Sequence, residues 1–295
     1  MSARKSKVWV AGEALIDLLP RDGASVAVVG GGAANTAKAL ANLEIDVSWV
    51  GGVSSDEYGN LIKKELESVD LSLANYSSLP TALAKVSLDR SGSASYEFLL
   101  DGTATFDFDL NWLPSGNPKI LHIGTLATIV EPGASNLFAW AKGLKAKVVF
   151  DPNVRPSVLS DKSRYRMAFE NWAKISSIVK MSNEDFEWLG YSTVNQILEL
   201  GPELLVVTHG AEGMTGYTAS GSVSVPGVNV QVVDTVGAGD TVGAVLVEGL
   251  LENGITSLVG EKLFEVLSRA AKAAAITCSR VGANPPKRAE LEYLG

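Results

Sequence analysis

The sequence predicts an α/β fold, namely a doubly wound, mostly parallel sheet with a small β-sheet lid. Two patterns support this prediction. Short apolar runs alternate with stretches of helical spacing over most of the chain, and two segments that look like paired strands interrupt the alternation. With 295 residues, 46% of them hydrophobic, the chain can bury a large core. We see no repeat or linker, so we expect one domain over residues 1–295.

Each buried strand is predicted from a short apolar run bounded by Gly, Asp or Pro. The runs are VWVAG (8–12), VSWVGG (47–52), ILHIG (120–124), VVFDPN (148–153), SSIVKMS (176–182) and ELLVVTHG (203–210). Helical spacing occupies most of the intervals between them, at 33–43, 58–69, 132–144 and 163–174. Two longer helices are expected at 238–252 and 257–277. Ligands of such sheets bind outside the carboxyl ends of the strands.

The predicted lid comes from two inserted segments, at about 13–29 and 80–104. Both look like paired strands, and DRSG (89–92) is expected to be a hairpin turn between alternating segments. Strands outside the central sheet could cover its carboxyl edge.

Composition excludes several classes of protein. The formal net charge is −8, from 33 acidic and 25 basic residues, which argues against binding to nucleic acid or to an anionic membrane. No apolar segment approaches the roughly 20 residues of a membrane span. The single cysteine, Cys278, cannot form an intramolecular disulfide and fits a reducing compartment, so we expect a cytoplasmic protein.

The stretch DTVGAGD (234–240) precedes a long apolar helix. Its small residues leave backbone N–H groups open at the helix start, where the helix dipole favours an anion such as phosphate. Asp240 could then accept a proton from an attacking hydroxyl, while Asp234 holds a cation or braces the loop. The alternative is a capped helix start, with one of the aspartates as the cap.

A second glycine-rich stretch, GGGAANTA (30–37), follows a strand and opens a helix. Gly31 and Gly32 permit close backbone approach to a ligand, and Asn35 suits sugar hydroxyls; the alternative is a tight turn with a capping Asn. Asp17 follows the first strand and could bind two adjacent hydroxyls. Arg155, at another strand end, could bind an anion or pair with an acid.

Other motifs are weak or missing. Thr208 ends a strand in a Gly-rich turn and is available to a phosphate, and SNEDFE (182–187) offers carboxylates that could order water around Mg²⁺. The two histidines lie far apart and no C-x-x-C occurs, which disfavours a zinc enzyme. No G-x-S-x-G, P-loop or G-x-G-x-x-G motif is present.

Gly31, Gly32 and Asn35 near the amino terminus, together with DTVGAGD near the carboxyl terminus, resemble the ribokinase-like sugar kinases, also called the phosphofructokinase B family. The resemblance runs through nearly the whole chain. PTALAKVSLDRSG (80–92), LHIGTLA (121–127) and FDPNVRP (150–156) look most like bacterial fructokinases. It implies an ATP- and Mg²⁺-dependent sugar kinase, in many members activated by a monovalent cation such as K⁺, and sometimes a homodimer paired through the lid.

Carried over position by position, the resemblance implies a role for each site residue. Asp240 is the catalytic base, Gly237, Ala238 and Gly239 form the anion hole, and Asp234 is the ligand of the monovalent cation. The sugar residues are Asp17, Gly31, Gly32, Asn35 and Arg155. The nucleotide residues are Thr208, Gly210, Gly213, Lys272 and Gly282.

Several positions depart from the family pattern, and the choice of acceptor is open. Glu44 and Ser54 stand where the first signature usually has small residues or glycine, and Lys272 replaces an expected Asn near the adenine. The N-x-x-E element appears as Ser182 and Asp185, in which case Asp185 would reach Mg²⁺ through water, or in another register as Asn183 and Phe186. We expect fructose as the acceptor. The alternatives are 2-keto-3-deoxygluconate or another sugar, and a sugar or nucleotide sensor that has lost turnover.

Overall fold

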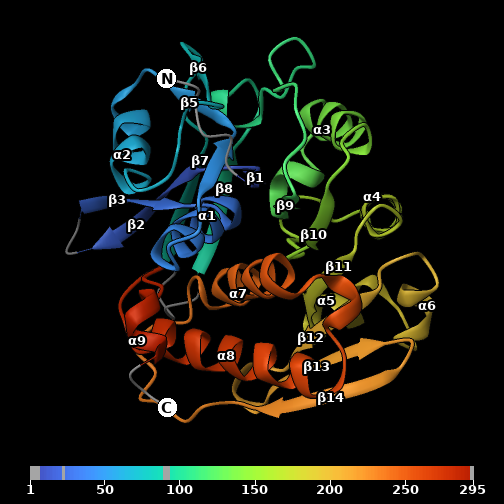
Figure 1. The fold of residues 1–295 in the computed structure, drawn as a ribbon. Coiled ribbons are helices and arrows are strands. Elements are labelled where there is room, and N and C mark those ends of the chain that lie inside the picture. Colours follow the sequence, from blue (N-terminus) through green and yellow to red (C-terminus); the bar gives the residue numbers. More distant parts are fainter. Residues whose placement is uncertain (1–6, 22–23, 89–93, 293–295) are drawn as a thin grey trace, which may run out of the picture.

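The computed structural model describes residues 7–21, 24–88 and 94–292, and it confirms the doubly wound α/β fold (Figure 1). All six strands predicted from apolar runs lie side by side in one sheet, in the order β14-β13-β12-β11-β10-β9-β1-β4. Neighbours from β4 to β12 run parallel. The parallel strands are β1 (Val8–Ala11), β4 (Val47–Val50), β9 (Ile120–Gly124), β10 (Lys147–Asp151), β11 (Ile178–Ser182) and β12 (Leu204–Thr208).

An antiparallel hairpin that the sequence did not predict extends one edge of this sheet. It consists of β13 (Gly213–Thr218) and β14 (Gly221–Pro226), and β13 pairs with β12. The hairpin contains three glycines and few apolar residues, so its alternation is weak. Gly216 lies where a Cβ would come within 3.1 Å of side-chain atoms of Leu263 and Leu267, so the hairpin packs closely on the helix beneath it.

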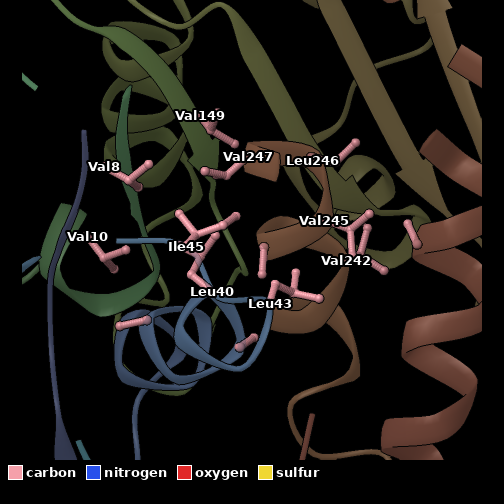
Figure 2. Close-up of a cluster of buried hydrophobic side chains, with 14 of the residues drawn as sticks. Val8, Val10, Leu40, Leu43, Ile45, Val149, Val242, Val245, Leu246 and Val247 are labelled. Atoms are coloured by element: carbon pink, nitrogen blue, oxygen red, sulfur yellow. The ribbon is translucent and has the colours of Figure 1, made fainter. Parts of the chain in front are cut away.

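Both faces of the sheet are buried. Alternate strand residues point to opposite sides, and helices cover each side. Val8 and Val10 of β1 belong to one buried cluster, whereas Trp9 and Ala11 belong to the other. Figure 2 shows the first cluster between the strands and two helices, α1 and α7. On this side lie α1 (Gly32–Asn42), α2 (Glu57–Glu65), α7 (Ala238–Asn253), α8 (Gly260–Cys278) and α9 (Arg288–Glu292). On the other lie α3 (Gly133–Lys142), α4 (Lys162–Ala173), α5 (Asn183–Leu189) and α6 (Asn195–Leu198).

Helix α7 explains why the carboxyl-terminal sequence is so apolar. Its residues from Asp240 to Leu250 are all buried, since it packs against the sheet, α1 and α8. The predicted second helix begins later than expected, at Gly260, because a short 3₁₀ turn at Ile255–Ser257 precedes it. No helix in the described part of the chain is both long enough and apolar enough to cross a membrane.

The two inserted segments form a separate four-stranded sheet, as predicted for the lid. Its order is β3-β2-β7-β8, with antiparallel hairpins at both sides and parallel pairing in the middle. The predicted turn at 89–92 lies outside the described residues. The lid strands are β2 (Leu15–Arg21), β3 (Ala24–Gly30), β7 (Leu83–Leu88) and β8 (Ala94–Leu99), and a two-stranded sheet pairs β5 (Gly52–Ser54) with β6 (Asn75–Ser77).

The strand order reverses between β1 and β9. The chain proceeds from β1 to β4 on one side, and then returns to β9, β10, β11 and β12 on the other. A crevice outside the carboxyl ends of the strands is the usual ligand site at such a reversal. The first lid hairpin, β2 and β3, is inserted between β1 and α1, and the second, β7 and β8, precedes β9, so both leave the large sheet at this point (Figure 1).

Candidate active site

A cavity of about 650 Å³ lies between the carboxyl edge of the large sheet, the start of α7 and the lid. Most of the predicted site residues line it, although they come from opposite ends of the chain. The predicted residues that line it are Asp17, Gly31, Gly32, Asn35, Arg155, Asp234, Gly237, Gly239, Asp240 and Gly282.

Asp240 lies in the first turn of α7, with only 8% of its surface exposed. The helix begins after Gly237, which has a left-handed backbone (φ 80°), and no side chain caps the helix start. A Cβ at Gly237 would also come within 2.7 Å of Ala283 Cβ, so glycine is required there. Neither Asp234 nor Asp240 caps the helix, which rules out the capping alternative. The N–H groups of the first turn stay available to an anion, apart from that of Ala238, which donates to the Thr235 oxygen at 3.3 Å.

Asn35 holds one oxygen of the Asp240 carboxylate. Its Nδ2 donates to Asp240 Oδ2 at 2.8 Å, across 205 positions of sequence. The other oxygen, Oδ1, lies beside Gly32, where an added Cβ would be 3.1 Å away. The bare glycine therefore keeps Oδ1 open toward the cavity.

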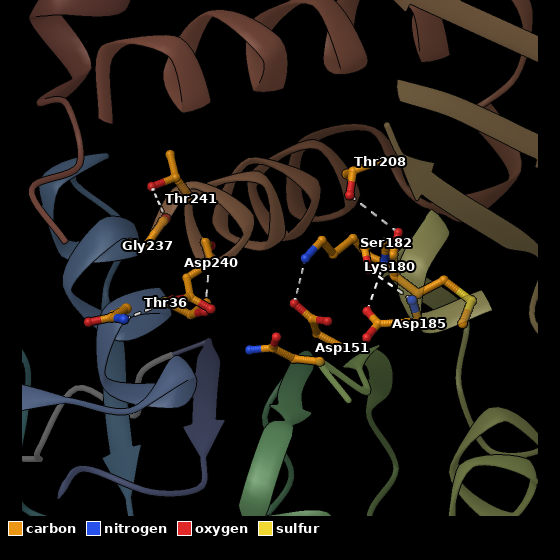
Figure 3. A network of polar contacts seen from close by, with 12 residues as sticks. Thr36, Asp151, Lys180, Ser182, Asp185, Thr208, Gly237, Asp240 and Thr241 are labelled. Carbon is orange, nitrogen blue, oxygen red and sulfur yellow. Dashed lines mark hydrogen bonds and ion pairs between the residues drawn. The ribbon is translucent and has the colours of Figure 1, made fainter. Parts of the chain in front are cut away.

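The surroundings of Asp240 shift the pKa of its carboxylate. Burial, together with the negative charge of Asp151, raises the pKa of Asp240 to about 7, although the Asn35 hydrogen bond and the charge of Lys180 oppose this rise. A carboxylate with a pKa near neutral pH is a stronger base than an ordinary one. Figure 3 shows Asp240 at the start of α7, with Asp151 at the end of β10 and Lys180 on the neighbouring strand β11.

Asp17 and Arg155 face the cavity from the lid side and the sheet side. Burial raises the pKa of Asp17 to about 6, and the charge of Arg155 opposes this rise. Arg155 makes no ion pair in the described part of the chain; its Nη1 donates to the backbone oxygens of Asn153 and Val154 at 3.3 and 3.0 Å. Arg155 is exposed, so its charge is free to meet a ligand.

Glu13 was missed by the sequence analysis, although it belongs to the site. It follows β1 and is 1% exposed, and it accepts hydrogen bonds from the backbone N–H groups of Gly32 (3.1 Å) and Ala127 (3.0 Å) and from the Thr125 hydroxyl. It thus ties the glycine loop to the end of β9. Burial raises the pKa of Glu13. An acid inside the apolar stretch VWVAGEALI was the available signal, because a buried carboxylate must be hydrogen-bonded.

Lys180 was also missed. It lies on β11, is 5% exposed, lines the cavity and pairs with Asp151 Oδ2 at 2.8 Å. A lysine within the otherwise apolar IVKM run was the signal, since lysine is seldom fully buried without a partner.

The residues expected to bind the nucleotide do not line the cavity, apart from Gly282. Gly210 borders open space, whereas Gly213 begins β13, where a Cβ would be 2.1 Å from the Val225 oxygen. Lys272 donates to the Leu291 oxygen at 2.9 Å and thereby holds α9. Thr208 lies at the end of β12. Nucleotide contacts at these positions stay predictions, but Gly213 and Lys272 have structural roles of their own.

The two residues expected to serve metals have backbone partners. Asp234 accepts from the N–H of Val236 (3.0 Å) and of Gly282 (2.9 Å), so it braces the loop before α7 against the carboxyl-terminal loop. Asp185 accepts from the N–H of Val154 and Ser182, and with Ser182 it forms a capping box at the start of α5. The described residues contain no cluster of three acidic, His or Cys side chains suited to a metal.

Ala238 is the first residue of α7, and it does not line the cavity. Its small side chain and the glycines on either side leave the backbone of this turn uncovered. This turn, Asp240 and the glycine loop at residues 30–32 together provide a place for an anion next to a base and a polar pocket.

Comparison with known proteins agrees with this arrangement. The model of the pfkB family of carbohydrate kinases matches residues 5–290. A fructokinase from Rhizobium leguminosarum bv. trifolii is 36% identical over 255 residues, covering 81% of this chain and 78% of the relative. A fructokinase from Xylella fastidiosa with bound ATP superimposes with a TM-score of 0.87 at 26% identity, covering 98% of both chains.

A double mutant of the Vibrio cholerae O395 fructokinase was solved with fructose, ADP and potassium ion. It superimposes with a TM-score of 0.82 at 26% identity, covering 98% of this chain and 97% of that one. The family match spans nearly the whole chain and includes every cavity residue named above. The protein therefore belongs to the pfkB family and is a carbohydrate kinase.

Proposed function

We propose that this carbohydrate kinase transfers the γ-phosphoryl group of ATP to O6 of fructose, which gives fructose 6-phosphate and ADP. The observation that carries the proposal is the position of Asp240. Its carboxylate is buried at the start of α7, one oxygen is held by Asn35, and the other opens beside Gly32 toward the cavity of about 650 Å³. The relatives named above are fructokinases, which supports the same substrate.

The chemistry follows from this geometry. Asp240 accepts the proton of the sugar hydroxyl as the hydroxyl oxygen bonds to the γ-phosphorus, and the bond between that phosphorus and the β–γ bridging oxygen breaks. The N–H groups at residues 237–239 and the dipole of α7 stabilise the charge on the transferred group. Glu13 holds the loop at Gly32, which keeps the hydroxyl, the base and the helix start aligned.

The charge of the cavity favours a neutral sugar over a sugar acid. Its described lining residues include four acids (Glu13, Asp17, Asp234 and Asp240) and only two basic residues (Arg155 and Lys180). Lys180 is paired with Asp151 and lies against the start of α7 at Gly239, so Arg155 is the cation left for a substrate carboxylate. The carboxylate of Asp17, by contrast, suits the adjacent hydroxyls of fructose.

The cofactors are ATP and a metal ion, as in the nucleotide- and metal-bound relatives. We propose Mg²⁺ as the divalent ion. Asp185 is engaged with backbone N–H groups, so the nucleotide phosphates and water would supply most of the Mg²⁺ ligands. For K⁺ we propose the loop that Asp234 braces through the backbone N–H groups of Val236 and Gly282.

We further propose a cytoplasmic protein that pairs through its lid. Residues Leu19, Val26 and Val28 of the lid hairpin are each between 37% and 39% exposed, which leaves apolar surface for a second copy. A cytoplasmic location agrees with a single cysteine and a nucleotide substrate.

Release of ADP, measured by an enzyme-coupled assay in Mg²⁺ and K⁺, tests the proposed function. We expect the highest kcat/KM with fructose among fructose, ribose, other neutral sugars and 2-keto-3-deoxygluconate, and ³¹P NMR should identify the product as the 6-phosphate. A preference for the sugar acid would replace fructose as the substrate. Tight sugar binding without ADP release would indicate a sensor instead.

A further inference from the structure

Among the described residues, Lys180 is the one buried cation beside the proposed path of the phosphoryl group. Its side chain extends from β11 toward the start of α7 (Figure 3). If Gly239 had a Cβ, that atom would lie 2.8 Å from Lys180 Nζ. The ammonium group therefore lies against the first turn of the helix, where glycine leaves room for it.

Carboxylates offset the cost of placing a lysine here: although burial opposes the charged form, the charge and hydrogen bond of Asp151, with the charges of Asp240 and Asp185, raise the pKa of Lys180. The start of a helix carries partial positive charge, so a second positive charge there is repelled. Asp151 compensates through Oδ2, but its Oδ1 has no hydrogen-bond partner among the described residues. Lys180 has three N–H donors and uses one of them on Asp151. Donors thus remain on the side that faces the helix and the cavity.

We propose that Lys180 is a catalytic residue whose ammonium group binds the oxygens of the γ-phosphoryl group during its transfer, and that Asp151 is a positioning residue that aims it. Lys180 forms no covalent bond and keeps its protons. It donates hydrogen bonds to the group that passes from ATP to the sugar, while Asp240 takes the hydroxyl proton. The inference rests on the proposed kinase reaction but not on the identity of the sugar.

A fixed ammonium group would also supply positive charge that a metal ion held by Asp185 would otherwise provide. With both Asp185 oxygens engaged in holding the start of α5 and the backbone of Val154, this carboxylate is poorly placed to organise a metal. A lysine supplies positive charge without a metal cage, as a compact and strongly hydrated point charge. The charge that faces the phosphoryl group would then come from Lys180, the nucleotide's own metal ion and the α7 dipole together.

The alternative is that Lys180 only neutralises Asp151 within the fold. The two explanations differ in how the variants should behave. Breaking a buried pair by removing one partner leaves an uncompensated charge, whereas removing both often restores stability. A neutralising lysine should therefore be dispensable once Asp151 is also neutral, but a lysine that binds phosphoryl oxygens should not be.

The test measures nucleotide binding without sugar, in the wild type, Lys180→Met and Lys180→Met/Asp151→Asn. Calorimetry with ADP and with a β,γ-methylene analogue of ATP gives the ratio of the two affinities. Because hydrogen bonds to charged groups are among the strong ones, we expect Lys180→Met to lower the analogue-to-ADP ratio about tenfold or more. We expect kcat to fall about 10²-fold or more and to stay low in the double variant.

The control is Lys147→Met, which removes an exposed lysine from β10 that pairs with Glu203 at 3.1 Å. It should change neither the ratio nor kcat. Equal losses of affinity for ADP and the analogue, or recovery of wild-type kcat in the double variant, would overturn the proposal. If Lys180→Met does not fold, as judged by circular dichroism, the double variant supplies the ratio. Absence of fructose phosphorylation in the wild type would count against the proposed substrate. The ratio of analogue to ADP affinity is measured without sugar, so it would still test the role of Lys180.

Discussion

Two carboxylates face the cavity from opposite walls, and they differ in how they are held. Asp240 belongs to a helix that packs deep in the α/β core, is 8% exposed and is fixed by Asn35. Asp17 belongs to the lid strand β2 and is only partly buried, and no hydrogen bond of its carboxylate is described. In the proposed reaction, the core thus presents a fixed carboxylate for the chemical step, whereas the lid presents one whose position depends on how the lid sits over the sugar.

Asp240→Asn should have the largest effect. Without a base to accept the hydroxyl proton, we expect kcat to fall about 10²-fold or more, while the fold and fructose binding are kept. The coupled assay gives kcat, and calorimetry with fructose gives the dissociation constant. Near wild-type turnover in a folded variant would remove Asp240 from the role of base.

Asp17→Asn should reduce kcat/KM by about tenfold, mainly through a higher KM for fructose. A carboxamide keeps the shape of the side chain but loses charged hydrogen bonds to sugar hydroxyls, and such bonds contribute roughly 1.5–3 kcal/mol. Steady-state kinetics with fructose measures the change. A loss confined to kcat would contradict a binding role for the lid carboxylate.

The reaction of the wild type should lose activity in acid. Asp240 acts as a base only when ionised, and its pKa is raised to about 7, so kcat/KM should rise with pH and level off above that value. Below it, each pH unit should cost about tenfold. A profile already flat at pH 5 would show that the base ionises far below neutral pH.

The smallest expected effect is on stability. Because the pKa of Asp240 is raised from 3.8 to about 7 in the folded protein, the free energy of unfolding falls as pH rises through this range. Asp240→Asn removes this cost, so at pH 8 it should be more stable than the wild type by on the order of 1–3 kcal/mol. At pH 4 the two should unfold alike. Urea unfolding at both pH values measures the difference, and a less stable variant at pH 8 would contradict the account.

The core was more predictable from sequence than the contacts across it. The six parallel strands are buried on both faces and therefore read as continuous apolar runs, which need no knowledge of the rest of the chain. The hairpin of β13 and β14 was missed because its glycines and polar residues give little alternation. Helix α7 was predicted nearly to its bounds, since its apolar stretch is long.

The cavity residues were predicted where a local motif marked them or where a polar residue followed a predicted strand, as Asp17 and Arg155 do. DTVGAGD and the glycine loop at 30–32 gave Asp240 and its surroundings, although the bond between Asn35 and Asp240 joins residues that no spacing rule connects. Glu13 and Lys180 were missed because each is a single charged residue within an apolar run, with partners that the chain brings in from other strands. Only the tertiary structure shows that these charges are paired and face one cavity.

The pH dependence of kcat/KM in Asp17→Asn tests most directly which wall of the cavity supplies the base. Both carboxylates have raised pKa values, about 6 for Asp17 and about 7 for Asp240, so the wild-type profile alone does not separate them. If Asp240 is the base, kcat/KM of the variant still falls below about pH 7, and its value at high pH is lower than in the wild type. Loss of the acid limb in this variant would assign the proton transfer to the lid and contradict the account.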